Sequence, residues 1–268
     1  MPNTFTRENF PNPTPPPATF ITQVFGIAAA GNTAGFYVDT AGLTHGFTNI
    51  GGTFATVDRL GTAFNQLLGI NLNGNEIAGY SSTDPAGATL QRAFWLVTGT
   101  TNYTDINALL VSKFGPNFNS QATGVNNAGI VAGFYQPTST TFSGFEDKGG
   151  VITQIDPFGS TNTQALGIDN NGDQIVGFEV DPGTGFQHGY VDINGVPSIF
   201  DPPGSVSTTI NGVNDLGQLV GFFTDANDNT IGFVATPTTT TTPEPGSLAL
   251  LATGLFGVGV AHRRRKSA

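Results

Sequence analysis

The sequence predicts an all-β protein, a five-bladed β-propeller-like ring of repeats with about 43 residues per blade, followed by a C-terminal transmembrane helix. Glycine and proline together contribute 54 of the 268 residues (37 and 17), and only 10% of the residues are charged. One glycine-flanked motif recurs five times, and an uncharged apolar run followed by arginines ends the chain. The 22 phenylalanines supply core anchors, so the chain is not disordered throughout.

The charge distribution excludes several function classes. Residues 1–242 hold five basic and 18 acidic side chains, which gives this part of the chain a formal charge of −13. Such an acidic body repels phosphate backbones, so we expect no nucleic-acid partner. The chain has no cysteine, which excludes disulfides, thiolate zinc sites and cysteine nucleophiles and fits an exported bacterial protein.

The repeats begin with a glycine, an aliphatic residue, three variable residues and a second glycine, and their starts lie 43, 55, 43 and 45 residues apart. These openings span residues 26–31, 69–74, 124–129, 167–172 and 212–217. A Gly–aromatic pair follows each opening, at 35–36, 79–80, 133–134, 177–178 and 221–222. A small residue and an aromatic come next, at 46–47, 93–94, 144–145, 189–190 and 232–233.

Each of the four complete repeats then has an aspartate 11 residues after the aromatic residue of this second pair: Asp58, Asp105, Asp156 and Asp201. Four extended stretches fit one period, and in the fourth repeat they are 163–168, 174–180, 189–193 and 196–200. The Asn-Asn-Gly and Ile-Asn-Gly turns between them are typical of tight hairpins. Four strands per period of about 43 predict a propeller blade. An open sandwich or a solenoid is the alternative.

The ends of the repeat region suggest how a ring closes. The fifth repeat stops at Ala235 without a fourth strand, whereas residues 3–6 at the N-terminus resemble the stretch 52–56. We predict that residues 3–8 pair beside 231–235, which removes free sheet edges. The N-terminal strand and Pro-rich linker then occupy 1–17, the repeats 18–235, and a Thr-rich linker 236–242.

The third-strand sequences of the first and fourth repeats, His45-Gly46-Phe47 and His188-Gly189-Tyr190, resemble the bacterial extracellular HAF repeat. The resemblance extends over residues 18–235 through short motifs that recur five times. It implies an extracellular location for the repeat region.

The C-terminal segment 243–268 has the layout of a membrane anchor. Its apolar run, 246–261, has 16 residues and rises about 24 Å as a helix, somewhat short of the hydrocarbon core of about 30 Å. A basic cluster directly after the run is expected to stay on the cytoplasmic side, which leaves the body outside. A C-terminal core helix of the body is the alternative.

This tail resembles the PEP-CTERM sorting signal of Gram-negative bacteria. The resemblance is carried by Pro243, Glu244 and Pro245, the apolar run, and Arg263, Arg264 and Arg265. It implies recognition by an exosortase, a transient stay in the inner membrane, and delivery to the cell surface or the exopolysaccharide layer. A similar tail also carries an ice-binding C-terminal label, but no regular Thr-x-Thr ladder runs through this body.

The start of the chain departs from that pattern. Proteins with this signal normally begin with a secretion signal, and residues 1–8 contain no apolar stretch. We therefore expect either that the start is assigned too far downstream or that the sequence is a fragment.

No residues are predicted to be catalytic, cofactor-binding or metal-binding. His45 and His188 share one repeat position, which favours a structural role. The unrepeated acids Glu76, Asp84, Glu146 and Glu179 show no sequence sign of meeting. The alternating oxygen ligands of 169–173 and 225–227 resemble calcium loops, but a plain turn is favoured. Two remaining features are an insertion within 107–119, interpreted as a length variant, and Trp95, interpreted as packing.

These features predict an exported, non-enzymatic, surface or exopolysaccharide-associated repeat protein. A lectin-like carbohydrate-binding propeller is the first alternative, and a glycan-active enzyme is the second. A lectin should expose aromatic and amide groups at equivalent blade positions. An enzyme should instead show one unrepeated carboxylate cluster, with two carboxyls roughly 5–10 Å apart.

Overall fold

The computed structural model describes residues 9–11, 21–116, 119–172 and 174–237. The chain divides into two compact units, Met1–Ala235 and Thr236–Ala268. Of the second unit, only residues 236 and 237 are among the described residues.

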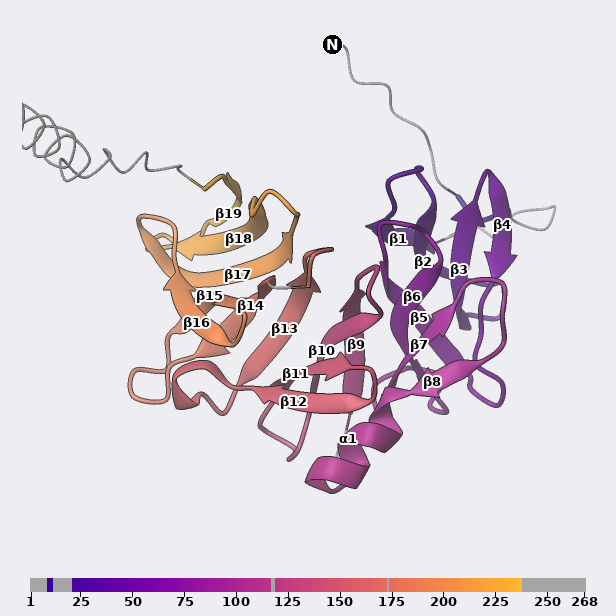
Figure 1. Cartoon of the computed structure of the whole chain (residues 1–268), viewed down its shortest axis with the longest axis horizontal. Coiled ribbons are helices and arrows are strands. Elements are labelled where there is room, and N and C mark those ends of the chain that lie inside the picture. The colour runs from indigo at the N-terminus through magenta and orange to yellow at the C-terminus, as the bar shows by residue number, and fades with distance from the viewer. Residues whose placement is uncertain (1–8, 12–20, 117–118, 173, 238–268) are drawn as a thin grey trace, which may run out of the picture. The chain divides into compact units, whose positions relative to one another are not determined.

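The first unit consists of five successive antiparallel meanders, here called blades 1 to 5 (Figure 1). Blade 1 contains β1 (Ile21–Ile27), β2 (Thr33–Val38), β3 (Thr44–Ile50) and β4 (Thr53–Thr56). Blade 2 contains β5 (Phe64–Ile70), β6 (Glu76–Ser82), β7 (Arg92–Val97) and β8 (Tyr103–Asp105). Blade 3 contains β9 (Ser120–Val125), β10 (Ile130–Tyr135), β11 (Ser143–Lys148) and β12 (Val151–Ile155). Blade 4 contains β13 (Thr163–Ile168), β14 (Gln174–Val180), β15 (Gln187–Ile193) and β16 (Val196–Phe200). Blade 5 contains β17 (Ser205–Val213), β18 (Leu219–Asp225) and β19 (Thr230–Ala235).

The strand prediction for the fourth repeat is confirmed. Three of its four strands have the predicted bounds, and β15 begins at Gln187, two residues before the predicted start. The antiparallel registers β13–β14, β14–β15 and β15–β16 form one blade, as the hairpin turns indicated. Blades 1 and 2 are joined into one sheet only by a single parallel pair, Thr44 with Phe64.

The opening glycine of each repeat lies where neighbouring blades approach each other most closely. A Cβ added to Gly69 would lie 3.0 Å from the Cα of Gly124, and one added to Gly167 would lie 2.9 Å from the Cα of Gly212. The first strands of consecutive blades therefore pack backbone against backbone. This contact explains why the motif opens with glycine in the first four repeats.

The described sheets do not close into a ring, so the predicted closure is wrong for this part of the chain. Val24 on β1 is 41% exposed and Val220 on β18 is 46% exposed, whereas Val176, the blade 4 equivalent of Val220, is fully buried. Gly212 meets only Val220 of its own blade, because no further blade among the described residues packs against it. The faces of blades 1 and 5 that would meet in a closed ring are therefore left uncovered.

The predicted pairing of residues 3–8 with 231–235 lies outside the described residues. Within them, β19 is the last strand of a three-stranded sheet. From the predicted N-terminal segment, Phe10 is described: its ring stacks on Tyr37 of β2 with 3.9 Å between centroids, and its backbone N–H donates to Thr22 Oγ1. The chain at residue 10 is thus anchored on blade 1.

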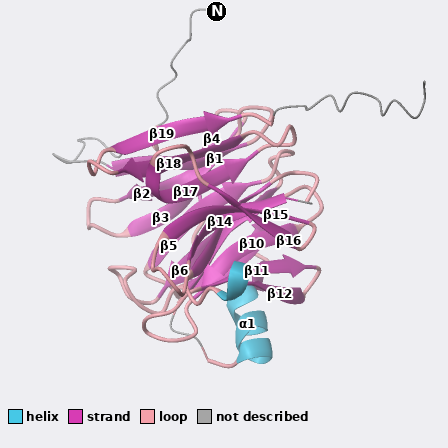
Figure 2. Ribbon diagram, turned by 90° about the vertical axis from the view of Figure 1, so that its left-hand side faces the viewer, coloured by secondary structure: helices cyan, strands magenta, loops and turns pink. Residues whose placement is uncertain are grey.

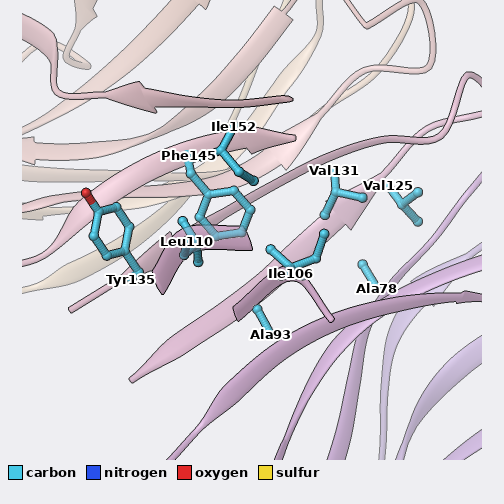
Figure 3. Close-up of a cluster of buried hydrophobic side chains, with 10 residues drawn as sticks. Ala78, Ala93, Ile106, Leu110, Val125, Val131, Tyr135, Phe145 and Ile152 are labelled. Atoms are coloured by element: carbon cyan, nitrogen blue, oxygen red, sulfur yellow. The ribbon is translucent and has the colours of Figure 1, made fainter. Parts of the chain in front are cut away.

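The insertion in the second repeat forms a helix that was not predicted, α1 (Ile106–Phe114). Asp105 caps its N-terminus by accepting a hydrogen bond from the backbone N–H of Ala108 at 2.9 Å. The helix lies beside β12 of blade 3 (Figure 2). Ile106 and Leu110 are fully buried in a cluster that includes Phe145 (Figure 3). Trp95 packs against the same cluster, as predicted.

Membrane spanning is the remaining fold prediction. Among the described residues no helix combines the length and the apolar character needed to cross a bilayer. The predicted span 246–261 lies outside those residues.

Candidate functional site

The residues predicted to carry sorting lie outside the described part of the chain. They are Pro243, Glu244 and Pro245 of the motif and Arg263, Arg264 and Arg265 of the membrane stop. The described cavities and polar clusters all belong to the blades.

The inner ends of all five blades line one cavity of about 540 Å³. Every blade contributes the aliphatic residue of its opening motif: Ile27, Ile70, Val125, Ile168 and Val213. The repeats are therefore arranged around a common axis, as a propeller requires.

A chain of hydrogen bonds around this cavity joins consecutive blades. The backbone N–H of Asn127 donates to Asn170 Oδ1 at 3.0 Å, and that of Asn170 donates to Asp215 Oδ1 at 2.7 Å. The backbone N–H of Asn73 similarly donates to Asn127 Oδ1 at 2.9 Å. Sequence analysis missed these contacts, although the fourth motif position, Asn or Asp in the last three repeats, was a visible signal.

The calcium-like segments form turns in the structure. Asp169 Oδ1 accepts hydrogen bonds from the backbone N–H groups of Gly172 and Gln174. Asp225 Oδ1 accepts from Asn227 and Asn229 in the same way. Within the described residues no group of three acidic or histidine side chains has metal-binding geometry, and Asp173 lies outside them. The turn interpretation accounts for both segments.

The aspartates that end the fourth strands connect that strand to the third. Asp58 Oδ1 accepts from the backbone N–H of Gly46 at 3.1 Å, and Asp201 Oδ1 accepts from Gly189 at 3.3 Å. The second oxygen of each carboxylate faces a histidine ring: His45 Nδ1 lies 2.5 Å from Asp58 Oδ2, and the blade 4 pair is separated by 2.6 Å. Both His–Asp pairs therefore lie within single blades at equivalent positions.

His45 has a second carboxylate beside it, because its Nε2 lies 3.2 Å from Asp39 Oδ2. Burial lowers the pKa of His45, but the hydrogen bonds and negative charges of Asp58 and Asp39 outweigh burial and raise it above 6.5. A raised folded-state pKa contributes stability below the unfolded value, and this contribution disappears as pH rises through the folded value. The imidazolium form therefore stabilises blade 1.

We predict that the free energy of unfolding falls as pH is raised from about 6 to about 9, and that His45→Gln removes part of this slope. Urea titrations at several pH values measure it. His188→Gln is the matched control, because it removes the equivalent ring but leaves the two carboxylates around His45 in place. An unchanged slope in His45→Gln would contradict the assignment.

The four unrepeated acids lie in separate local environments. Glu76 Oε2 accepts from Asn71 Nδ2 at 3.0 Å, and Asp84 accepts several bonds from its own loop, including one from Ala86 N–H. Glu179 is buried in blade 4, and its burial raises its pKa. Of the four acids, Glu146 is the one that belongs to the lining of a groove described below.

The groove that includes Glu146 lies between blades 3 and 4 and has a volume of about 510 Å³. We call it the β12 groove, because its wall follows β12 and the turn after it. Its polar and aromatic lining includes Glu146, Lys148, Gln154, Asp156, Phe158, Asp192 and Asn194. Burial raises the pKa values of all three carboxyl groups in this lining. Sequence analysis missed this groove, because its acids come from two different repeats.

Comparison with known families identifies the tail. Residues 241–265 match the PEP-CTERM protein-sorting motif. This signal indicates export, anchoring in a membrane before cleavage, and processing by an exosortase. The prediction of a sorting signal is thereby confirmed. No curated protein matches the chain in sequence.

Comparison with solved structures concerns the blades. TolB from Acinetobacter baumannii has a TM-score of 0.53 at 12% identity over 81% of this chain and 52% of its own. A putative TolB from Agrobacterium tumefaciens has the same score and identity, over 81% of this chain and 82% of its own. The β-propeller domain of the Trilobed protease from Pyrococcus furiosus, described as having an open velcro topology, scores 0.49 at 10% identity over 82% and 70%. This chain thus spans about half the length of the Acinetobacter TolB chain. At such identities the likeness shows an all-β fold with propeller neighbours and nothing about activity.

Proposed function

We propose that the chain is an exported, non-enzymatic repeat protein that an exosortase delivers to the cell surface or to the exopolysaccharide layer. The single observation that carries the proposal is the PEP-CTERM match over residues 241–265. The blades are then the part displayed outside, with 236–242 as a Thr-rich stalk. Assignment of the blades as HAF-type repeats belongs to this proposal, as does the membrane span 246–261.

Outside the β12 groove, the described polar side chains support a structural rather than a catalytic body. The recurring aspartates bind backbone N–H groups, and both His–Asp pairs connect strands of one blade. A general acid–base pair needs carboxyls with contrasting environments around one reacting centre. The body's acidity also suits an extracellular role without nucleic-acid contact.

A lectin-like module is the second candidate. The observation that favours it is the β12 groove, which combines carboxylates and amides with an exposed aromatic ring on a rigid scaffold. This candidate is compatible with sorting, because the groove lies in the blades and the sorting motif in the tail.

The test of the sorting proposal uses a host that contains an exosortase, with every form expressed behind the same secretion signal. The full chain, a chain ending at Thr242 and a P243A/E244A/P245A variant are compared by cell fractionation and by the size of the surface form. We expect the full chain to pass through the inner membrane and reach the surface in shortened form. The chain ending at Thr242 should be released without a membrane stage, and the motif variant should remain uncleaved in the membrane.

The matched control is T238A/T239A/T240A, which alters the neighbouring linker outside the matched motif. It should be processed like the unaltered chain. Equal surface amounts and equal sizes for the full chain and the motif variant would contradict sorting by this motif.

A further inference from the structure

We propose that the β12 groove binds a glycan that carries free amino groups. The proposal concerns the blades alone and goes beyond sorting, so it stands or falls separately from the role of the tail.

The charge of the groove selects the ligand class. Its lining has three carboxylates, Glu146, Asp156 and Asp192, against one ammonium group, Lys148. Glu146 belongs to blade 3 and Asp192 to blade 4. Burial raises the pKa of Glu146, the charge of Lys148 lowers it, and the charge of Asp192 raises it. Two of the three carboxylates remain without a cation from the described lining, so a ligand ammonium between the two blades pairs with them, and ligand hydroxyl groups donate to the same oxygens. A uronic-acid glycan is repelled for the same reason.

A buried hydroxyl without a partner lies behind the same wall. Tyr190 is fully buried, and its hydroxyl has no hydrogen-bond partner among the described residues. Asp192 lies two residues further along β15, on the same face, and both Asp192 and Asp156 act electrostatically on the hydroxyl. The ring also packs with Ile155 and Ile175, which line the groove. The unpartnered hydroxyl therefore lies beneath the lining of the groove, where two of the groove's carboxylates act on it.

The groove also has an aromatic platform. Phe158 follows β12 and is 52% exposed, with a φ of 56° that bulky residues rarely adopt. An exposed ring held in this conformation offers a face for the apolar side of a sugar and for an ammonium group. The volume of about 510 Å³ falls within the range of small-ligand pockets.

The equivalent turn between blades 1 and 2 lacks the acidic surplus. Leu60 takes the place of Phe158 and is 99% exposed. Its neighbour Arg59 forms an ion pair with Asp105 at 2.5 Å and lines the local pocket together with Asp58. That pocket has no uncompensated acidic charge in its described lining, so Leu60 supplies a matched control position.

The test is isothermal titration calorimetry of the full chain in a neutral detergent. The three probes are a glucosamine tetramer, its fully N-acetylated form and a galacturonate tetramer. We expect the glucosamine tetramer to bind with a 1:1 ratio, the N-acetylated form about tenfold more weakly, and the galacturonate form not at all. Glu146→Gln and Phe158→Ala should each weaken binding of the glucosamine tetramer about tenfold.

Two further variants separate a site from general attraction to an acidic protein. Tyr190→Phe should leave affinity within about twofold, because the hydroxyl is fully buried and lies outside the lining of the groove. Leu60→Ala should leave affinity within about twofold. Equal binding by all variants, equal binding of the three tetramers, or no binding of the glucosamine tetramer would overturn the proposal. None of these results bears on the sorting experiment, which reads out cleavage and location.

Discussion

Gly177→Ala is expected to destabilise the blades by about 3 kcal/mol, which lowers the thermal midpoint by about 6–12 °C for a unit of this size. A Cβ on Gly177 of β14 would lie 1.9 Å from the carbonyl oxygen of Gln164 and 3.1 Å from the Cα of Ala165. Both atoms belong to the backbone of β13, so no side-chain rotation relieves the overlap. The strand pair has to separate at its centre.

The cause of this close approach is an irregularity that recurs in every first strand. The β13–β14 register shifts between Ala165 and Gly167, which turns the Gln164 carbonyl toward the neighbouring strand. The same contact occurs in the other blades, where a Cβ at the matching glycine would lie 1.9–2.2 Å from a carbonyl oxygen of the first strand. These glycines are Gly35, Gly79, Gly133 and Gly221.

Gly232→Ala is the control, measured by the same thermal and urea unfolding experiments. Gly232 stands in the third strand of blade 5, where the nearest atom to an added Cβ is 3.9 Å away. The blade 4 equivalent, Gly189, meets the carbonyl of Phe200 on the fourth strand, and the described part of blade 5 has no such strand. Gly232→Ala should change stability by less than about 0.5 kcal/mol. Equal losses in both variants would contradict the steric explanation.

These glycines show why the blades could be predicted from the sequence. The bulge, the glycine and the aromatic residue recur at a fixed spacing because the first and second strands of every blade approach each other equally closely at this point. The regularity therefore fixes strand positions such as 163–168 and 196–200 without any knowledge of tertiary structure. Asp58 and Asp201, which follow the fourth strands of blades 1 and 4, could be predicted for the same reason, since each bonds within its own blade.

Features that depend on the placement of one blade against another were not predictable in the same way. Glu146 and Asp192 are 46 residues apart in sequence and share a groove only because blades 3 and 4 pack side by side. The prediction that the ring closes was wrong for a related reason. Strand count and turn composition do not determine the angle between neighbouring blades, and that angle decides whether Val220 of blade 5 is covered by blade 1.

The helix α1 was missed because the repeat frame assigned its residues to an insertion. Ile106, Leu110 and Phe114 recur every four residues, which is a helical spacing. Asp105 was interpreted as a strand-ending aspartate like Asp58, and in the structure it also caps the helix. An aspartate can end a strand or cap a helix. Only the four-residue spacing of the apolar residues that follow Asp105 distinguishes the two roles.

The position of α1 leads to the second large effect, for Leu110→Ala. Leu110 is fully buried against residues of blades 2 and 3, among them Phe145 and Ile152 (Figure 3). Its truncation should cost about 2–5 kcal/mol, since the removed methyl groups leave a cavity that the rigid strands on either side cannot fill. Alanine favours a helix at least as much as leucine does, so the loss reports packing rather than helix propensity.

Val111→Ala is the control for the packing contribution of Leu110. Val111 is the next residue of the same helix but is 37% exposed, and its truncation should cost less than about 0.5 kcal/mol. Urea unfolding of both variants, followed by far-UV circular dichroism, gives the comparison. If Leu110→Ala were as mild as Val111→Ala, α1 would be a surface appendage on the blades, and the insertion would be a neutral length variant after all. A large difference makes the insertion a structural element that joins blade 2 to blade 3.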